Sequence, residues 1–497
     1  MQFDQLLATA GLEVDPPASP VEVGSVTFDS RRAAPGTCFV AVRGWTHDGH
    51  DFIPAATKAG CAAVVCEDPS NVPARVPCAV VGNTHDALGQ LAQAIRGWPA
   101  RQLVNIGITG TNGKSTVAHL VHRILESAGH SPALLGTIQY QTGQRSIEAG
   151  TTTPDPVMLA ELMSEMVQSG RTHLVMEVSS HALHQHRAAG VDFHVGLFTN
   201  LSGDHLDYHG TMDQYLAAKR RLFESLRPDA VAVINSDDPH AQAMAQATAA
   251  PVLLYGLEEH PDLRGRIERL DDRGAEFTLE HGRRQVTVVS SLIGKHNVLN
   301  CLAAAGAGVA LDVDLPTIAV ALGSASPVPG RLQRVPGRAP YQIFVDYAHT
   351  DDALANVLSS LRQVVQGRLM VVFGCGGDRD RSKRQRMGRV AAQMADHVIV
   401  TSDNPRSEDP VAIIDEILAG LDTGARNRCD VQPDRRKAIA MAIDLAADGD
   451  IVLLAGKGHE KYQQIGDRRV EFSDMAVAGE LIRRGGGVGH QAQEHSE

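Results

Sequence analysis

The segment TGTNGKST has the residue types of a loop that binds nucleotide phosphates. Gly110 and Gly113 would let backbone N–H groups wrap around phosphate oxygens at the start of a helix. Lys114 would neutralise the β- and γ-phosphates, and the Ser115 hydroxyl would bind Mg²⁺. The strict spacing of such loops requires a further glycine where this chain has Ile108. The nucleotide site is therefore predicted from the GKS triplet and its position between a strand and a helix.

Acidic and histidine side chains elsewhere in the same region could complete a metal site. Glu177 ends the apolar run HLVMEV, which is the position of an acidic metal ligand beside a phosphate loop. His205 and His209, at i, i+4 spacing, also suit zinc, although no cysteine lies near them in the sequence and the HExxH pattern is missing. Cys61 and Cys66 leave a disulfide or a zinc site open as a weaker alternative. We predict magnesium.

A second group of candidate residues follows apolar runs in the last third of the chain. The loops GGDRD, SDNPR and GKGHE carry Arg379, the segment 403–406 and Glu460. In open α/β sheets, ligands bind beyond the carboxyl ends of the strands. Arginine suits a carboxylate and an acid suits an ammonium, so these loops predict a ligand with both groups, such as a diamino-dicarboxylate. The alternative for Arg406 is a surface arginine in a proline turn.

The elements that must position these loops alternate between apolar runs of strand length and segments of helix length. HLVMEV, VGLFTN and AVAVIN are separated by helix-length segments, which indicates a parallel sheet with crossover helices. A more β-like patch follows at 275–289. An amphipathic helix is predicted directly after the phosphate loop, with its apolar face formed by Val117, Leu120, Val121, Ile124 and Leu125.

The bulk properties limit the class of protein. A chain of 497 residues is long enough for two to four domains. Its 46 Lys and Arg against 58 Asp and Glu give a net charge of −12, which argues against binding to nucleic acid or anionic membranes. The seven cysteines form no CxxC pair, which fits a reducing compartment. The start MQFDQLLATAGLEV predicts no signal peptide, and no run of about 18 apolar residues occurs, so we expect a cytoplasmic protein.

Nine segments, in order between residues 109 and 460, resemble the motifs of the Mur ligase family. They are TGTNGKST, MEVSSHALHQHR, TNLSGDHLDYHGTMDQYLAAK, NVLNCLAA, PGRLQRV, DYAHT, GCGGDRDRSKR, DNPRSEDP and AGKGHE. One such motif would be weak support, whereas nine in order are specific. Within the family, DNPR is similar to the motif of the ligases that add meso-diaminopimelate, and lysine-adding relatives lack its arginine.

The resemblance implies an α/β fold with three domains. They are an N-terminal UDP-sugar domain (1–100), a central P-loop ATPase-type domain with a parallel or mixed sheet (101–330), and a C-terminal Rossmann-like domain for the amino acid (331–485). The composition supports both boundaries, because Pro- and Gly-rich breaks fall at 97–102 and 326–342. Residues 486–497 are expected to form a disordered tail.

The resemblance also implies which residues contact each ligand. The positions that match ATP contacts of the family are Gly110, Thr111, Asn112, Gly113, Lys114, Ser115, Thr116, Asn300, Arg331, Asp346 and His349. The positions that match contacts to the UDP-linked precursor are Phe28, Ser30, Trp45, Thr46, His47, Thr151, Thr152, Thr153, Ser179, Gln185 and Arg187. The positions that match contacts to the incoming amino acid are Arg379, Asp403, Asn404, Pro405, Arg406, Gly456 and Glu460. Arg406 would bind the distal carboxylate, which lysine does not have.

The family pattern assigns catalysis to Lys114, Glu177, His205 and Lys219, and Mg²⁺ binding to Ser115, Glu177, His205 and Lys219. Lys219 matches a lysine that the family carries as a carbamate formed with CO₂, which turns a cation into an anion that can help position Mg²⁺. The sequence alone would place Lys219 on a solvated helix face. The chain departs from the family at Asp351, usually proline, and at Ser115, more commonly threonine.

The implied reaction is the ligation of meso-diaminopimelate to the D-Glu γ-carboxylate of UDP-MurNAc-L-Ala-D-Glu, with ATP split to ADP and phosphate, in peptidoglycan synthesis for the cell wall. The carboxylate would attack the ATP γ-phosphate, and the amine would then attack the acyl phosphate. Phosphoryl transfer of this kind needs positioning and charge neutralisation. The sequence does not identify the base that deprotonates the amine.

The expected partners are therefore ATP, the UDP-linked precursor and diaminopimelate, with Mg²⁺ and CO₂, in a monomer. Alternatives within the family's chemistry are a lysine-adding ligase or a folylpolyglutamate-type synthetase, and DNPR and GCGGDRD argue against both. From a different class, a P-loop kinase or a nucleotide-gated binding module also fits the phosphate loop. Phosphate release that requires an added amino acid would separate a ligase from these.

Overall fold

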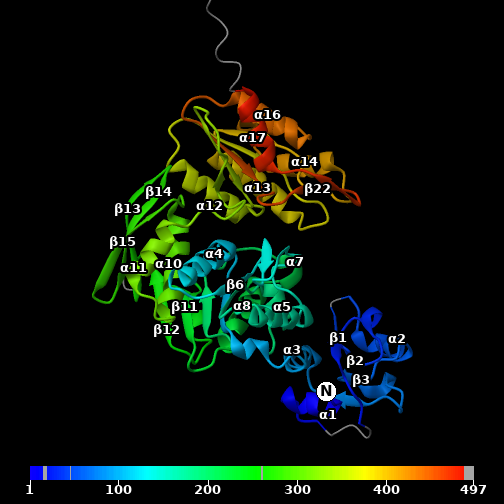
Figure 1. Cartoon of the computed structure of the whole chain (residues 1–497). Coiled ribbons are helices and arrows are strands. Elements are labelled where there is room, and N and C mark those ends of the chain that lie inside the picture. The colour runs from blue at the N-terminus through cyan, green and yellow to red at the C-terminus, as the bar shows by residue number, and fades with distance from the viewer. Residues whose placement is uncertain (15–19, 45, 259–260, 486–497) are drawn as a thin grey trace, which may run out of the picture.

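Three groups of strands and helices follow one another through the molecule in the computed structural model, each with its own sheet (Figure 1). The structure describes residues 1–14, 20–44, 46–258 and 261–485. Trp45 and the expected tail at 486–497 lie outside the described residues. The central group, cyan to green in Figure 1, lies between the blue N-terminal group and the yellow-to-red C-terminal group.

The N-terminal group is built on a parallel sheet of four strands in the order β1-β2-β3-β4. The strands are β1 (Ser25–Thr27), β2 (Thr37–Val40), β3 (Ala63–Cys66) and β4 (Cys78–Val80). The helices are α1 (Phe3–Thr9), α2 (Ile53–Lys58) and α3 (Thr84–Ala94), with 3-10 turns η1 (Ser30–Arg32), η2 (Gly49–Phe52), η3 (Pro69–Asn71) and η4 (Pro99–Gln102). The Asn83 side chain caps α3 by accepting from the N–H groups of His85 and Asp86.

The central group is built on a mixed sheet of eleven strands in the order β15-β14-β13-β12-β11-β10-β5-β9-β6-β7-β8. The strands are β5 (Val104–Thr109), β6 (Pro132–Leu135), β7 (Gln139–Gln141), β8 (Ser146–Glu148), β9 (His173–Glu177), β10 (Val195–Phe198), β11 (Val231–Asn235), β12 (Val252–Gly256), β13 (Leu263–Asp271), β14 (Gly274–His281) and β15 (Arg284–Ser290). The helices are α4 (Lys114–Ser127), α5 (Pro156–Gln168), α6 (Ser180–His184), α7 (Leu206–His209), α8 (Met212–Glu224), α9 (Ala241–Ala245), α10 (Lys295–Ala310) and α11 (Leu315–Gly323).

Two hydrophobic cores cover the two faces of this central sheet. One contains apolar residues of α4, α10 and α11, and the other contains residues of α5 and α8. The predicted apolar face of α4 is confirmed, since Val117, Leu120, Val121, Ile124 and Leu125 are all buried in the first core. Because β5, β9 and β10 are parallel neighbours, the loops after them meet at one edge of the sheet.

The C-terminal group has a six-stranded sheet in the order β16-β17-β21-β18-β19-β20, parallel except at β16, and a separate hairpin. The strands are β16 (Gln333–Arg334), β17 (Gln342–Asp346), β18 (Leu369–Phe373), β19 (His397–Val400), β20 (Cys429–Val431), β21 (Ile451–Ala455), β22 (Tyr462–Ile465) and β23 (Arg468–Glu471). The helices are α12 (Asp351–Arg362), α13 (Ser382–Met394), α14 (Pro410–Leu418), α15 (Thr423–Arg426), α16 (Arg435–Leu445) and α17 (Asp474–Gly485).

The structure accounts for the departure at Asp351. This residue lies in the first turn of α12, where a carboxylate interacts favourably with the helix dipole, and Thr350 caps the helix. The Asp351 carboxylate also accepts from Arg386 of α13 at 2.9 Å. None of the helices in the described residues is both long enough and apolar enough to cross a membrane.

Candidate active site

The phosphate loop lies between β5 and α4, and the residues after β10 hold its backbone. Thr199 Oγ1 donates to Asn112 O at 2.7 Å. Gly110 has φ +150°, and a Cβ there would lie 1.8 Å from Thr199 Oγ1. Gly113 has φ +87°, and a Cβ there would lie 2.4 Å from Asn300 Oδ1. Only glycine fits these two positions, so the loop can place its N–H groups at the start of α4, where phosphate binds well.

The Lys114 side chain folds back over this loop. Its Nζ donates to Gly110 O at 2.9 Å and to Thr111 O at 2.8 Å. Burial lowers the pKa of Lys114, and the negative charge of Glu177 opposes that shift. The ammonium group therefore lies where phosphate oxygens would meet the loop.

Ser115 and Glu177, both buried, and the partly buried Thr137 form a group of oxygen atoms beside the loop. Ser115 Oγ donates to Glu177 Oε2 at 3.0 Å, as does Thr137 Oγ1 at 3.0 Å. The backbone N–H of Thr137 donates to Glu177 Oε1 at 2.8 Å. Hydroxyl and carboxylate oxygens are ligands that Mg²⁺ accepts, usually one or two from protein and the rest from water and phosphate. The Ser115 and Glu177 oxygens therefore fit a Mg²⁺ ion bound together with a nucleotide.

Lys219 is buried in the same region, although the sequence alone placed it on a solvated helix face. Its side chain on α8 is 1% exposed, and Nζ donates to Gly110 O at 2.8 Å. Burial first, and the charge of Lys114 second, hold the pKa of Lys219 well below its ordinary value. His205 is left-handed at φ +55° and lines the same cavity as Ser115 and Glu177.

This cavity has a volume of about 510 Å³ and extends from the phosphate loop to the C-terminal group. It brings together every residue predicted for ATP except Gly110, together with Thr152 and Ser179 of the precursor set and the metal residues apart from Lys219. Arg331 connects the two groups, because Nη2 donates to Ser115 Oγ at 3.3 Å while Cζ lies 4.9 Å from the centre of the Tyr347 ring. Asp346 accepts from the N–H groups of Leu332 and Ala348, which fixes the Arg331 loop.

A second cavity, of about 570 Å³, lies between the N-terminal and central groups. It is lined by Phe28, Thr151, Gln185 and Arg187, which belong to the set predicted for the UDP-linked precursor. Ser30, Thr46 and His47 do not line it. Thr153 is fully buried, and its hydroxyl bridges Glu177 O and the Ser179 N–H, so its side chain supports the site from behind.

The loops predicted for the amino acid converge after β18, β19 and β21. Arg406 Nη1 donates to Gly377 O at 2.6 Å, and Asn404 Nδ2 donates to Glu460 Oε2 at 2.8 Å. Arg406 has φ +51°, a conformation that is uncommon for a residue with a side chain. The remaining predicted residues take different positions: Arg379 is exposed, Asp403 is buried, Gly456 begins the third loop, and Pro405 lines a cavity behind it.

Comparison with known proteins accounts for this arrangement. The Mur ligase family catalytic domain, the Mur ligase middle domain and the glutamate ligase domain of the Mur ligases match residues 22–96, 108–308 and 330–458. A relative from Geobacillus kaustophilus, UDP-N-acetylmuramoyl-L-alanyl-D-glutamate–2,6-diaminopimelate ligase, is 44% identical over 94% of this chain and 96% of its own. The chain belongs to the Mur ligase family.

Solved structures of Mur ligases and related enzymes share the fold. A structure of a UDP-N-acetylmuramoyl-L-alanyl-D-glutamate–2,6-diaminopimelate ligase matches with a TM-score of 0.69 at 34% identity, over 98% of this chain and 100% of that one. A Mycobacterium tuberculosis folylpolyglutamate synthase complexed with ADP and AMPPCP matches at 0.61 and 20% identity over 73% of this chain and 91% of its own, which shows a shared fold alone. Like its family, this Mur ligase is an ATP-dependent enzyme that forms an amide bond.

The zinc alternatives receive no support from this Mur ligase structure. Within the described residues, no group of three or more His, Cys, Asp and Glu side chains could hold a metal ion. Cys61 and Cys66 are free thiols, and the Cys66 and Cys78 sulfurs lie 3.4 Å apart on neighbouring strands. His209 Nε2 instead lies 3.0 Å from Ser180 Oγ.

Several residues of the Mur ligase site were missed from the sequence. Asp352 accepts from Asn112 Nδ2 at 2.8 Å and from Ser202 Oγ at 2.7 Å, so it joins the phosphate loop to α12. The only sequence signal for it was its place directly after DYAHTD. Thr137 gave none, because it lies in a short loop between two strands that the apolar pattern did not reveal.

A polar clamp holds the two arginine-bearing loops of the Mur ligase together. Arg384 is fully buried and donates to both Glu408 oxygens, at 3.0 and 2.9 Å, and to Gly376 O at 3.3 Å. The Asp378 N–H donates to Glu408 Oε1 at 2.6 Å. Hydrogen bonds from Arg384 and Arg381 lower the pKa of Glu408 to about 2. Glu408 therefore joins GGDRD to the segment that follows DNPR.

Replacement of Glu408 by glutamine should loosen these loops. We expect the KM for the amino acid to rise on the order of tenfold, because charged hydrogen bonds are lost. A carboxylate with a lowered pKa stabilises the fold above its ordinary pKa of 4.5, and this stabilisation is lost as the pH falls towards 2. The difference in unfolding free energy between wild type and variant, measured in urea, should therefore shrink over that range. Asp467→Asn, at an exposed position, is the control.

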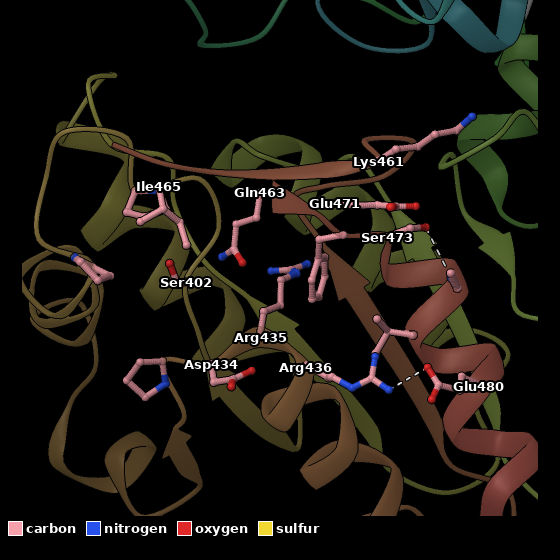
Figure 2. Close-up of a pocket in the computed structure, with 16 residues that line it drawn as sticks. Ser402, Asp434, Arg435, Arg436, Lys461, Gln463, Ile465, Glu471, Ser473 and Glu480 are labelled. Atoms are coloured by element: carbon pink, nitrogen blue, oxygen red, sulfur yellow. Dashed lines mark hydrogen bonds and ion pairs between the residues drawn. The ribbon is translucent and has the colours of Figure 1, made fainter. Parts of the chain in front are cut away.

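A third cavity, of about 810 Å³, lies behind these loops, between hairpin β22–β23 and the starts of α16 and α17 (Figure 2). Figure 2 shows Arg435 beneath the hairpin beside Gln463, with Arg436 paired to Glu480 at the edge. Arg435 forms a fully buried ion pair with Asp474 at 2.6 Å and donates to Ala455 O at 2.9 Å. It thereby braces the end of β21, from which the loop GKGHE starts.

Proposed function

We propose that this Mur ligase adds meso-2,6-diaminopimelate to the D-Glu γ-carboxylate of UDP-MurNAc-L-Ala-D-Glu in peptidoglycan synthesis. The observation that carries this is the convergence of DNPR, GGDRD and GKGHE, which are joined by the Arg406–Gly377 and Asn404–Glu460 hydrogen bonds. Arginine and an acid at one site suit a ligand with a carboxylate and an ammonium. The relatives at 44% and 43% identity carry the name of the same ligase.

Each group of elements has its own role in this proposal. Residues 1–100 bind the UDP end of the precursor, 101–330 bind ATP and the D-Glu carboxylate, and 331–485 bind the amino acid. The cavity lined by Phe28, Gln185 and Arg187 supports the first role. The position of Arg331, between Ser115 and the C-terminal group, supports reaction at the junction of the last two. The enzyme acts as a monomer in the cytoplasm, where ATP and nucleotide-linked precursors are found.

Binding of the phosphates is the task of the loop at the start of α4. Its N–H groups and the Lys114 ammonium neutralise the β- and γ-phosphates, so that the negatively charged carboxylate can approach the γ-phosphorus. Ser115 and Glu177 would hold Mg²⁺, which would supply further positive charge to the phosphates. Thr137 orients Glu177 through both of its carboxylate oxygens.

In this proposal Lys219 is carbamylated and, with Glu177 and His205, would help to hold the metal. Three observations support the modification: the side chain is buried, it lies against the phosphate loop at Gly110 O, and no carboxylate in the described part of the chain forms an ion pair with it. Burial favours the uncharged amine, which is the form that reacts with CO₂. Carbamylation would convert this amine into an anion, which suits a site beside a Mg²⁺ ion.

The C-terminal loops deliver the second substrate to the activated carboxyl group. Arg406, with Arg379 nearby in the GGDRD loop, binds the distal carboxylate of diaminopimelate, and Glu460 binds its distal ammonium. The other amine of diaminopimelate then attacks the acyl phosphate carbon, the C–N bond forms, and phosphate leaves. Positioning of this amine beside the carbonyl is the main contribution of the domain.

The test is phosphate release by the purified enzyme with ATP, Mg²⁺ and UDP-MurNAc-L-Ala-D-Glu. Parallel reactions contain meso-diaminopimelate, L-lysine or no amino acid. We expect release only with diaminopimelate, accompanied by the UDP-linked tripeptide product in mass spectra. Release with lysine instead would keep the reaction class and reject the amino acid. Release without any amino acid would reject a ligase in favour of a simple nucleotide hydrolase.

A further inference from the structure

Lys457 is a buried lysine beneath the second-substrate loops, and the reaction outlined above gives it no role. It follows β21 in the loop GKGHE, and its side chain is 0% exposed. Its Nζ donates to Glu460 Oε2 at 2.9 Å and to Asn404 Oδ1 at 3.1 Å, and lies 3.9 Å from Asp403 Oδ1. A buried ammonium is costly unless it is paired, so these contacts hold it firmly in place.

The contacts of Lys457 determine which way the Asn404 amide faces. Asn404 Oδ1 accepts from Lys457 Nζ and also from the Gln464 N–H at 2.9 Å. Both partners are donors only, so this atom must be the amide oxygen, and the amide NH₂ must lie on the other side. That NH₂ donates to Glu460 Oε2 at 2.8 Å and has a second N–H. Asn404 can therefore offer a ligand a donor, which suits a carboxylate.

The same contacts leave one oxygen of Glu460 for a ligand. Oε2 accepts from both Lys457 Nζ and Asn404 Nδ2. For Oε1, by contrast, the described residues supply no hydrogen-bond donor. Glu460 thus keeps one carboxylate oxygen available as an acceptor, which suits an ammonium.

We infer that Lys457 is a positioning residue that sets the polarity of the second-substrate site. By fixing the amide orientation of Asn404 and engaging one oxygen of Glu460 while the other stays available, it creates adjacent positions for a carboxylate and an ammonium. These are the two groups of an amino-acid centre, and this inference rests on the proposed function. Lys457 does not itself touch the substrate; it selects ligands with a distal ammonium through Glu460.

The neighbouring Lys461 provides a matched control. It lies four residues further along the chain, is exposed, and lines the edge of the cavity behind the hairpin (Figure 2). A Lys461→Met variant therefore removes a lysine from this loop without changing the contacts of Asn404 or Glu460. Lys457→Met removes the buried ammonium and keeps a side chain of similar length.

The experiment compares two second substrates that differ only in the distal ammonium. These are meso-diaminopimelate and 2-aminopimelate, which keeps the reacting amine and the distal carboxylate. Wild type should prefer diaminopimelate in kcat/KM. In Lys457→Met this preference should fall on the order of 10- to 100-fold, mainly through the KM for diaminopimelate, because a charged hydrogen bond to Glu460 is lost. The KM values for ATP and the UDP-linked precursor should stay unchanged, and Lys461→Met should behave like wild type.

Retention of the full preference by Lys457→Met would overturn the inference. Wild type that is inactive with diaminopimelate would instead overturn the proposed function. If Lys457→Met does not fold, because it leaves Glu460 and Asp403 without a cation, the comparison uses Glu460→Gln and Glu460→Gln/Lys457→Met. A residue that acts through Glu460 should add little to the loss of preference already caused by Glu460→Gln. A further large fall in the double variant would show an independent role and reject the inference.

Discussion

Replacement of Lys219 by alanine is expected to abolish turnover, with kcat lower by a factor of about 1,000 or more, the loss typical for removal of a charge that stabilises the reaction centre. The reason is structural: Lys219 Nζ lies 2.8 Å from Gly110 O, at the base of the phosphate loop. If this nitrogen carries a carbamate, its loss removes an anion beside Glu177 and the metal. The measurement is phosphate release at saturating ATP, precursor and diaminopimelate.

Two further observations separate the carbamate from an ordinary structural lysine. Short carboxylic acids added to Lys219→Ala should restore part of the activity, because they can occupy the space of the missing carbamate. In wild type prepared with ¹³C-bicarbonate, a carbamate resonance should appear that is missing from Lys219→Met, a variant that fills the same space. Full activity in either variant would reject the role, and an inactive variant without a carbamate signal in wild type would leave Lys219 as a structural amine.

Local motifs predicted the parts of this site that depend on local structure. GKS before an amphipathic segment located the phosphate loop, and the end of HLVMEV located Glu177, because a strand followed by a helix fixes where such side chains emerge. The parallel order of β5, β9 and β10 then brings Ser115 and Glu177 to one edge. Their side chains are hydrogen-bonded there at 3.0 Å.

The sequence did not reveal which polar side chains are buried or which distant residues they contact. Lys219 lies in AAKRRLFE, a segment whose charges indicate a solvated face, and only the packing of α8 against the sheet buries it. Thr153 was predicted as a precursor contact, but its hydroxyl bonds to main-chain atoms. Lys457 lies in a recognised motif, yet the role inferred for it depends on its hydrogen bond to Asn404, 53 positions earlier in the chain.

The C-terminal site shows how local strain and tertiary contacts combine to present one side chain. Arg406 has φ +51°, and its main chain is held on both sides by the hairpin, through the Gln464 carbonyl at 3.1 Å and the Gly466 N–H at 2.7 Å. The hairpin therefore stabilises a conformation that the DNPR segment alone would adopt rarely. The clamp at Glu408 fixes the segment from the other side.

Conversion of Arg406 to lysine is expected to raise the KM for diaminopimelate on the order of 100-fold while the KM values for ATP and the UDP-linked precursor stay the same. A guanidinium can bond to Gly377 O through Nη1 at 2.6 Å and still offer further N–H groups in a fixed plane to a carboxylate. A lysine ammonium has no such fork, so it must either keep the carbonyl contact or bind the substrate well. The measurement is the KM for each of the three substrates.

A comparison of diaminopimelate with L-lysine as second substrate tests the role of Arg406 most directly. If Arg406 binds the distal carboxylate, Arg406→Lys should lose most of the preference for diaminopimelate over L-lysine, because lysine never used that contact. Arg389→Lys, at an exposed position on α13, should leave the preference intact. An unchanged KM for diaminopimelate in Arg406→Lys would show that Arg406 only closes the loop onto Gly377, and recognition of the carboxylate would then fall to Arg379 and the Asn404 amide.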